Sequence, residues 1–182
     1  MSELFEAVRE DYESWREFLY QQVSFQREFS LIHGMEHCER VLRFALMIAE
    51  AKGLSQTQKD TLATAAVFHD SKRMSDGRDK GHGRRGAEYY REFCERADMV
   101  FDPVCYEIIA WHDRHDEDGV FAVDFACSDR EDAVLLYQIF KDADGLDRVR
   151  FGPHGVDLNR LRTPEAVALY SYALLLVNWG ES

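Results

Sequence analysis

The chain has 182 residues, 46% hydrophobic and 31% charged, a composition typical of a soluble globular protein large enough to bury a core. Its formal net charge of −12 argues against a nucleic-acid partner, because such proteins normally present a basic face to the phosphate backbone. No apolar stretch is long enough to span a bilayer, the N-terminus lacks a secretion signal, and the four cysteines form no CxxC pair, so we expect a cytoplasmic protein with no membrane partner.

Three helices are predicted before residue 70. Apolar and aromatic residues recur at helical spacing over residues 3–28. A second helix follows a short loop and ends at Gly53, and His37 leads its apolar face. Ser55 and Gln58 have the spacing of a capping box, which predicts a third helix that runs into the adjacent pair His69-Asp70.

The remaining chain predicts further helices over about 83–97, 102–112, 128–144 and 163–179. Two of them begin with an N-cap residue followed by proline, at Asp102-Pro103 and Thr163-Pro164. Another begins with capping-box spacing at Ser128 and Glu131. Residues 120–126 fit either a short extended piece or an irregular crossing. The sequence therefore predicts an all-α fold, in one domain over residues 1–182.

Several predicted helices carry an imidazole or a carboxylate on the face intended for the core. These side chains are His37, His69, Asp70, His112 and Asp144. Burial of such groups costs several kcal/mol unless they are partnered. Each taken alone fits a satisfied core residue, but the joint pattern favours a shared divalent cation. Asp142 falls on a different face of its helix and is expected behind the ligands or at the surface.

A basic segment interrupts this acidic chain. Between residues 72 and 91, seven basic residues stand against three acidic ones. This pattern indicates a small anionic ligand, although a solvated loop would show the same composition.

The series His37, His69-Asp70 and Asp144 resembles the HD superfamily of metal-dependent phosphohydrolases, an all-helical fold named for the adjacent pair. The resemblance covers about residues 33–150. In the closing motif of that family, within Lys141–Arg148, the aspartate after alanine is normally the ligand, which favours Asp144. The chain lacks the Gly-Tyr-Pro motif of the cyclic-dinucleotide phosphodiesterases and the paired carboxylates of the alarmone hydrolases, so those activities are not supported.

Two further segments resemble the members with a dinuclear site. They are Gly81–Ala87, which contains His82, and Ile108–His112. By that resemblance a first metal would be held by His37, His69, Asp70 and Asp144. Asp70 would bridge to a second metal held by His82 and His112. Mixed nitrogen and oxygen ligands suit Mn, Fe, Co, Ni or Zn, and Mg where few imidazoles bind. One ion or two are both compatible with this pattern.

The resemblance implies a metal-dependent phosphoric ester hydrolase in which His69 and Asp70 belong to the catalytic centre and a metal activates water. Its substrate would be a small phosphorylated molecule, expected to be a nucleotide. The side chains expected to contact this substrate are His33, Lys72, Arg73, Arg84, Arg85 and Arg148. Two other interpretations stay open: a non-catalytic domain that binds metal and nucleotide for regulation, and an HD-fold di-iron oxygenase. The oligomeric state is also left open.

Overall fold

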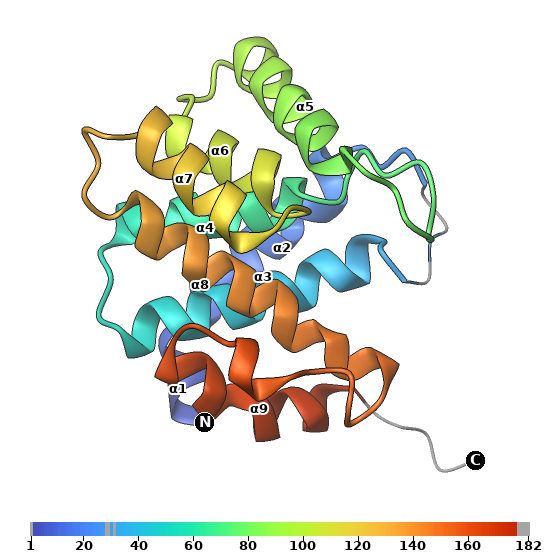
Figure 1. The fold of residues 1–182 in the computed structure, drawn as a ribbon, viewed down its shortest axis with the longest axis vertical. Helices are drawn as coiled ribbons and strands as arrows, with labels where there is room; N and C mark the ends of the chain where they lie inside the picture. The colour runs from blue at the N-terminus through green and yellow to red at the C-terminus, as the bar shows by residue number, and fades with distance from the viewer. Residues whose placement is uncertain (1, 28–29, 31, 178–182) are drawn as a thin grey trace.

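A computed structural model describes residues 2–27, 30 and 32–177. Within them the chain forms α-helices and two short 3-10 helices, with no strand, as Figure 1 shows. The elements are α1 (Ser2–Ala7), α2 (Arg9–Gln22), α3 (Met35–Ala51), α4 (Gln56–Phe68), α5 (His82–Ala97), α6 (Pro103–Trp111), α7 (Asp116–Ala126), α8 (Ala133–Leu146), η1 (Asp147–Phe151), η2 (Leu158–Arg160) and α9 (Pro164–Leu176). The all-α prediction is confirmed. Among these elements, none is a helix long and apolar enough to cross a membrane.

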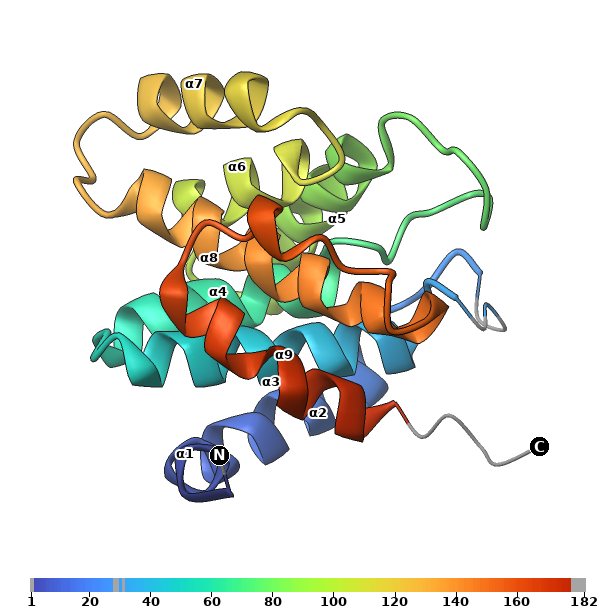
Figure 2. The ribbon, with the colours of Figure 1, turned by 60° about the horizontal axis from the view of Figure 1, so that its bottom comes forward.

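Helix α3 lies at the centre of the fold. It packs against α4 and α8 and also contacts α1, α2 and α9. Helices α3, α4 and α8 form a central layer. In Figure 2, α5, α6 and α7 lie on one side of this layer, and α1, α2 and α9 lie on the other. Ten residues of α3 are buried, among them Val41, Phe44 and Ile48. A helix that is apolar over most of its circumference is expected in such a position.

Three of the predicted helix starts that depend on local capping are confirmed. The Ser55 side chain accepts a hydrogen bond from the Gln58 backbone, and the reciprocal bond completes the capping box of α4. The Asp102 side chain accepts from the Val104 N–H at the start of α6, and the Thr163 side chain accepts from the Ala166 N–H at the start of α9, each followed by proline. These signals lie within four consecutive residues, so the sequence carries them without reference to the rest of the fold.

The predicted helix over residues 3–28 is wrong in its extent. It is broken at Val8 and ends at Gln22, while residue 28 lies outside the described residues. Val8 is buried between α1 and α2, with φ −113° and ψ 8°. After α2 the backbone is extended at Val23, and the Gln26 N–H donates to the Ser71 carbonyl. A long-range contact with the segment after α4 therefore replaces further helical turns.

Residues 120–126 belong to helix α7, so neither an extended piece nor an irregular crossing is correct. Three acidic residues fill its first turn, where the helix dipole favours negative charge. Val123 is the only large apolar side chain of α7 that is buried, whereas Phe121 and Phe125 are exposed. The usual amphipathic pattern is therefore absent from the sequence.

The boundaries of the last two helices also differ from the prediction. Helix α8 begins at Ala133, and the capping box expected at Ser128 and Glu131 does not form. The residue before α8 is Asp132, whose side chain caps no backbone N–H. Helix α9 ends at Leu176, and the predicted end at Trp179 lies outside the described residues.

Candidate metal centre

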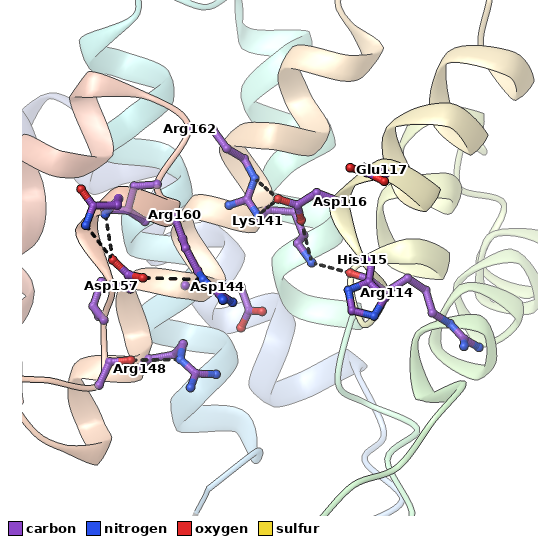
Figure 3. A pocket seen from close by; sticks show the side chains of 15 residues that line it. Arg114, His115, Asp116, Glu117, Lys141, Asp144, Arg148, Asp157, Arg160 and Arg162 are labelled. Carbon is purple, nitrogen blue, oxygen red and sulfur yellow. Dashed lines mark hydrogen bonds and ion pairs between the residues drawn. The ribbon is translucent and has the colours of Figure 1, made fainter.

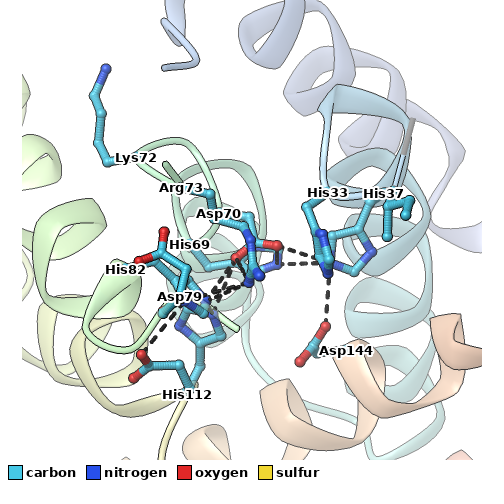
Figure 4. Close-up of polar contacts among 12 residues, drawn as sticks. His33, His37, His69, Asp70, Lys72, Arg73, Asp79, His82, His112 and Asp144 are labelled. Atoms are coloured by element: carbon cyan, nitrogen blue, oxygen red, sulfur yellow. Dashed lines mark hydrogen bonds and ion pairs between the residues drawn. The ribbon is translucent and has the colours of Figure 1, made fainter. Parts of the chain in front are cut away.

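Two groups of buried side chains meet between the central helices, as Figure 4 shows. His37, His69 and Asp70 form the first group, and Asp70, His82 and His112 form the second. Within each group the candidate ligand atoms lie within 4.8 Å of one another. The two groups could each hold a metal ion, and Asp70 belongs to both.

The carboxylate of Asp70 lies between the two groups. Its Oδ1 is 3.0 Å from His82 Nε2 and 3.4 Å from His112 Nε2. Its Oδ2 is 3.6 Å from His37 Nε2 and 4.0 Å from His69 Nε2. Although Asp70 Oδ1 is buried, it receives no hydrogen bond from the described residues. A buried, unpartnered carboxylate oxygen is costly, and a cation at this position would satisfy it.

Each histidine ring is held from outside through Nδ1. The acceptors are Asp147 Oδ2 for His37 (2.7 Å), the Ala66 carbonyl for His69 (2.9 Å), the Asp79 carbonyl for His82 (2.6 Å) and the Ile109 carbonyl for His112 (2.7 Å). A carbonyl oxygen only accepts, so the ring nitrogen beside it carries the proton. In a neutral ring the lone pair is then on Nε2, which faces the centre.

The Nε2 atoms approach one another closely. His37 and His69 are 3.1 Å apart through these atoms, and His82 and His112 are 2.9 Å apart. Two inward lone pairs at such a distance repel unless a proton or a metal ion lies between them. Imidazole nitrogen together with carboxylate oxygen is a donor set that fits a divalent first-row metal. The residues present therefore fit the implied metal.

Asp144 stands beside the first group. From α8 its Oδ1 lies 3.3 Å from His37 Nε2, and the side chain remains partly exposed. Burial alone would lower the pKa of His37, but the carboxylates of Asp144 and Asp147 raise it to about 9. Burial also lowers the pKa of His69, to about 3, so that ring is neutral at pH 7. In the metal-free protein a proton on His37 therefore supplies the positive charge at this group.

Asp147 is a residue that the sequence reasoning missed. It is fully buried and accepts hydrogen bonds from His37, Arg40 and Arg150. Its only sequence signal is its position three residues after Asp144, on the same face of a continuing helix. It holds the His37 ring in the orientation that directs Nε2 inward.

Asp142 is not a surface group, and that part of the prediction is wrong. Its side chain has no exposed area and does not reach the metal groups. It accepts from the Arg162 and Thr163 backbone N–H groups, at 2.9 and 2.8 Å. Asp142 therefore secures the connection between α8 and α9.

The glycines around His82 allow α5 to approach the other helices. A Cβ at Gly83 would lie 2.7 Å from the Ile109 carbonyl, and one at Gly86 would lie 2.8 Å from the His69 carbonyl. Side chains at these positions would push α5 away from α4 and α6. The glycine-rich segment thus brings His82, the first residue of α5, to the second group.

Of the described side chains that were predicted to contact substrate, only Arg73 touches the second group. Its Nη1 lies 3.1 Å from His82 Nε2 and 3.5 Å from Asp70 Oδ1. Its Nη2 donates to the Gly77 carbonyl at 2.9 Å. The guanidinium therefore places a positive charge where three electron-rich atoms converge.

Three other predicted contacts are not brought to the metal groups. Lys72 donates to the Ser24 carbonyl (2.7 Å), lies over the Tyr89 ring and points away from the centre in Figure 4. Arg84 donates to the Tyr106 hydroxyl, and Arg85 to the Lys72 carbonyl. The basic segment is therefore only partly directed at the centre.

His33 lies at the edge of the first group. Its ring packs edge-on against His37, with 5.9 Å between ring centroids. Its Nδ1 is buried and makes no hydrogen bond within the described residues. Burial lowers the pKa of His33 to about 4, so the ring is neutral at pH 7 and can accept a proton or a hydrogen bond.

Two pockets reach the centre from the surface. A pocket of about 940 Å³ is lined by Asp144, on the side of the first group, and by Arg148 (Figure 3). A second one, of about 470 Å³, is walled by His82 and Arg73 on the side of the second group. Arg114 and His115 line both pockets, so the two lie side by side.

Comparison with family models identifies the fold family. The model of the HD domain matches residues 34–149, from the start of α3 to η1. The chain belongs to the HD domain family. The matched part of this HD domain contains both groups of candidate ligands, and also Asp147. Comparisons with curated proteins and with solved structures gave no match.

Proposed function

We propose that this HD domain is a metal-dependent hydrolase of small phosphate esters. The observation that carries the proposal is the buried Asp70 carboxylate, held between inward-facing imidazoles and next to two pockets that arginine side chains help to line. His37, His69, Asp70 and Asp144 would hold one ion, and Asp70, His82 and His112 a second. When bound, a divalent ion would activate a water molecule and polarise a phosphoryl oxygen.

The protein side chains contribute orientation and charge. The Nδ1 contacts hold the imidazoles, so little reorganisation is needed when an ion binds. Arg148 in the larger pocket and Arg73 in the smaller one approach the centre from two sides. Arg148 would neutralise and orient a phosphate, because its planar fork matches two phosphate oxygens, and Arg73 would add positive charge beside the second group. The arginines in these pockets favour a phosphate ester over the substrate of a di-iron oxygenase.

The proposal is tested by loading the purified protein with Mn, Fe, Co, Ni, Zn or Mg and measuring phosphate release from a panel of phosphate esters. We expect release that depends on metal, and a loss of at least 10³-fold in Asp70→Ala. His154→Ala serves as the matched control, because His154 is exposed and lines neither pocket.

Two outcomes would contradict hydrolysis. Stoichiometric metal without phosphate release from any ester would favour the binding-domain interpretation, provided that nucleotides still raise the melting temperature. Oxygen consumption by the iron-loaded protein would favour the oxygenase instead.

A further inference from the structure

The larger pocket differs from a nucleotide site in its chemistry. It is formed by the segment between α6 and α7, the end of α8, and residues 155–162 (Figure 3). We propose that its occupant is a small polyhydroxylated molecule that carries a second anionic group, as in a sugar bisphosphate. The inference rests on the proposed function, because the phosphate to be hydrolysed lies beside Asp144.

Three arginines from separate segments surround this pocket with unused donors. Arg148 donates through Nε to the Gly155 carbonyl at 3.1 Å. Arg114 and Arg160 lie 3.3 and 3.6 Å, through Nε, from the carboxylates of Asp113 and Asp157. No Nη atom of these three arginines donates a hydrogen bond to a described residue. All three side chains are exposed, so their guanidinium forks face solvent and remain available to a ligand.

The other two basic residues of the pocket are already engaged. Lys141 donates to the His112 and Arg114 carbonyls, at 2.7 and 3.0 Å. Arg162 is paired with Asp116 and Asp142. Structural demands therefore account for these two but not for the three arginines. A single phosphate at Asp144 would not occupy three forks on three segments, so the pocket still has donors to offer to a second anionic group.

Nucleobase recognition would find little of its usual apolar and aromatic support in this pocket. Proteins commonly hold a base by stacking it on an aromatic side chain or in an apolar cleft. Among the described residues, His115 supplies the only aromatic ring of the pocket, no phenylalanine, tyrosine or tryptophan lines it, and only Val156 and Leu161 contribute larger apolar side chains. Glu117 and Asn159 instead offer polar groups to hydroxyls. This wall suits a polyol better than a base.

The test compares glucose 6-phosphate, glucose 1,6-bisphosphate and AMP as substrates of the metal-loaded protein. We expect kcat/KM for the bisphosphate to exceed the other two values at least tenfold. The double substitution Arg114→Ala with Arg160→Ala should lower kcat/KM for the bisphosphate at least tenfold more than for the monophosphate, mainly through KM. Arg91→Ala, on the exposed surface of α5 and outside both pockets, is the control and should change neither.

A binding measurement separates this inference from the proposed function. Calorimetric titration with glucose 1,6-bisphosphate and with AMP reports the preference of the pocket without turnover. The inference is overturned if AMP is preferred, if the monophosphate matches the bisphosphate, or if the double variant binds the bisphosphate unchanged, even when esters are hydrolysed. Preferred binding of the bisphosphate without hydrolysis of any ester would support the inference as a binding specificity and contradict the proposed hydrolase.

Discussion

At the scale of single residues, the centre depends on the outer contacts of its imidazoles. His69, His82 and His112 each bond through Nδ1 to a carbonyl three residues earlier in the chain. These three rings are therefore oriented by their own local backbone. His37 instead depends on Asp147, which lies 110 residues away.

This difference predicts a specific effect of Asp147→Asn. The asparagine removes the negative charge that orients and polarises the His37 ring, so we expect metal affinity to fall by roughly 10- to 100-fold. Chelator competition measures this change, with Asp129→Asn on the exposed surface as the control. Unchanged affinity would show that Asp147 serves only to neutralise Arg40 and Arg150.

A second residue-scale prediction concerns Arg73. Its guanidinium lies next to His82 Nε2 and Asp70 Oδ1. A metal ion held by Asp70, His82 and His112 must therefore displace or repel it. We expect Arg73→Ala to raise the affinity for a second ion about tenfold or more. Metal analysis after dialysis against a graded series of free metal measures the effect. Arg84→Ala is the control, because Arg84 contacts Tyr106 instead. An identical second affinity in both variants would refute this role.

At the scale of elements, the connection from α8 to α9 is held by one buried carboxylate. Asp142 accepts from two backbone N–H groups, the Thr163 hydroxyl and the Arg162 guanidinium. Residues 159–162, which this network anchors, also line the larger pocket. Helix packing and pocket shape are therefore linked through Asp142.

Asp142→Ala should destabilise the protein strongly. It leaves a guanidinium and three other donors without their acceptor, which we expect to cost about 3–5 kcal/mol of unfolding free energy. Urea unfolding at pH 7 measures the loss, and Asp129→Ala provides the comparison for an exposed aspartate. A loss below about 1 kcal/mol would mean that water replaces the carboxylate at little cost.

The start of α8 predicts a pH dependence. Asp132 accepts from Arg130 Nε at 3.0 Å and from Gln58 Nε2 at 2.9 Å, which ties α8 to α4. The bond from Arg130 holds the pKa of Asp132 below its usual value. A lowered carboxyl pKa stabilises the fold above the unfolded value of about 3.9, and this stability is lost as the pH falls through the folded value.

We therefore expect Asp132→Asn to cost about 0.5–1 kcal/mol at pH 7, an amount typical of a partly exposed pair. The difference from the wild type should shrink as the pH is lowered from 5 to 3. Urea unfolding across this range measures it. A difference that stays constant would assign the effect to hydrogen-bond geometry, with no contribution from charge.

At the scale of the whole molecule, the centre exists only where the helices meet. Its candidate ligands come from α3, α5 and α8 and from the ends of α4 and α6. Asp70 and Asp147 are buried there and the partly exposed Asp144 lies beside them, so three carboxylates repel one another within a chain of net charge −12. A bound cation offsets this repulsion, so it couples metal occupancy to global stability.

Metal removal should therefore lower the melting temperature. A ligand that binds only the folded state at 100 times its Kd stabilises it by about 2.7 kcal/mol. We expect a chelator to lower the melting temperature of the loaded protein by several degrees and fresh metal to restore it. Asp70→Ala should show no such response. Equal melting temperatures with and without metal would mean that the ion contributes little to folding.

The sequence by itself determined the features that neighbouring residues control. Capping at Ser55, Asp102 and Thr163 is set within one turn of helix, so these starts were predictable. The candidate ligands were also visible, because a histidine or aspartate on an otherwise apolar face stands out from its helical period. Helix α7 lacked that contrast, since Phe121 and Phe125 face solvent, and it was missed.

Only the tertiary structure decided which polar groups share one space. The role of Asp147, the engagement of Asp142 and the direction of Lys72 away from the centre all depend on contacts between residues distant in sequence. The larger pocket likewise joins residues 114–117 to residues 141–162. Periodicity reveals which face of a helix is buried but not which other helix covers it, because that choice is made by packing across the whole core.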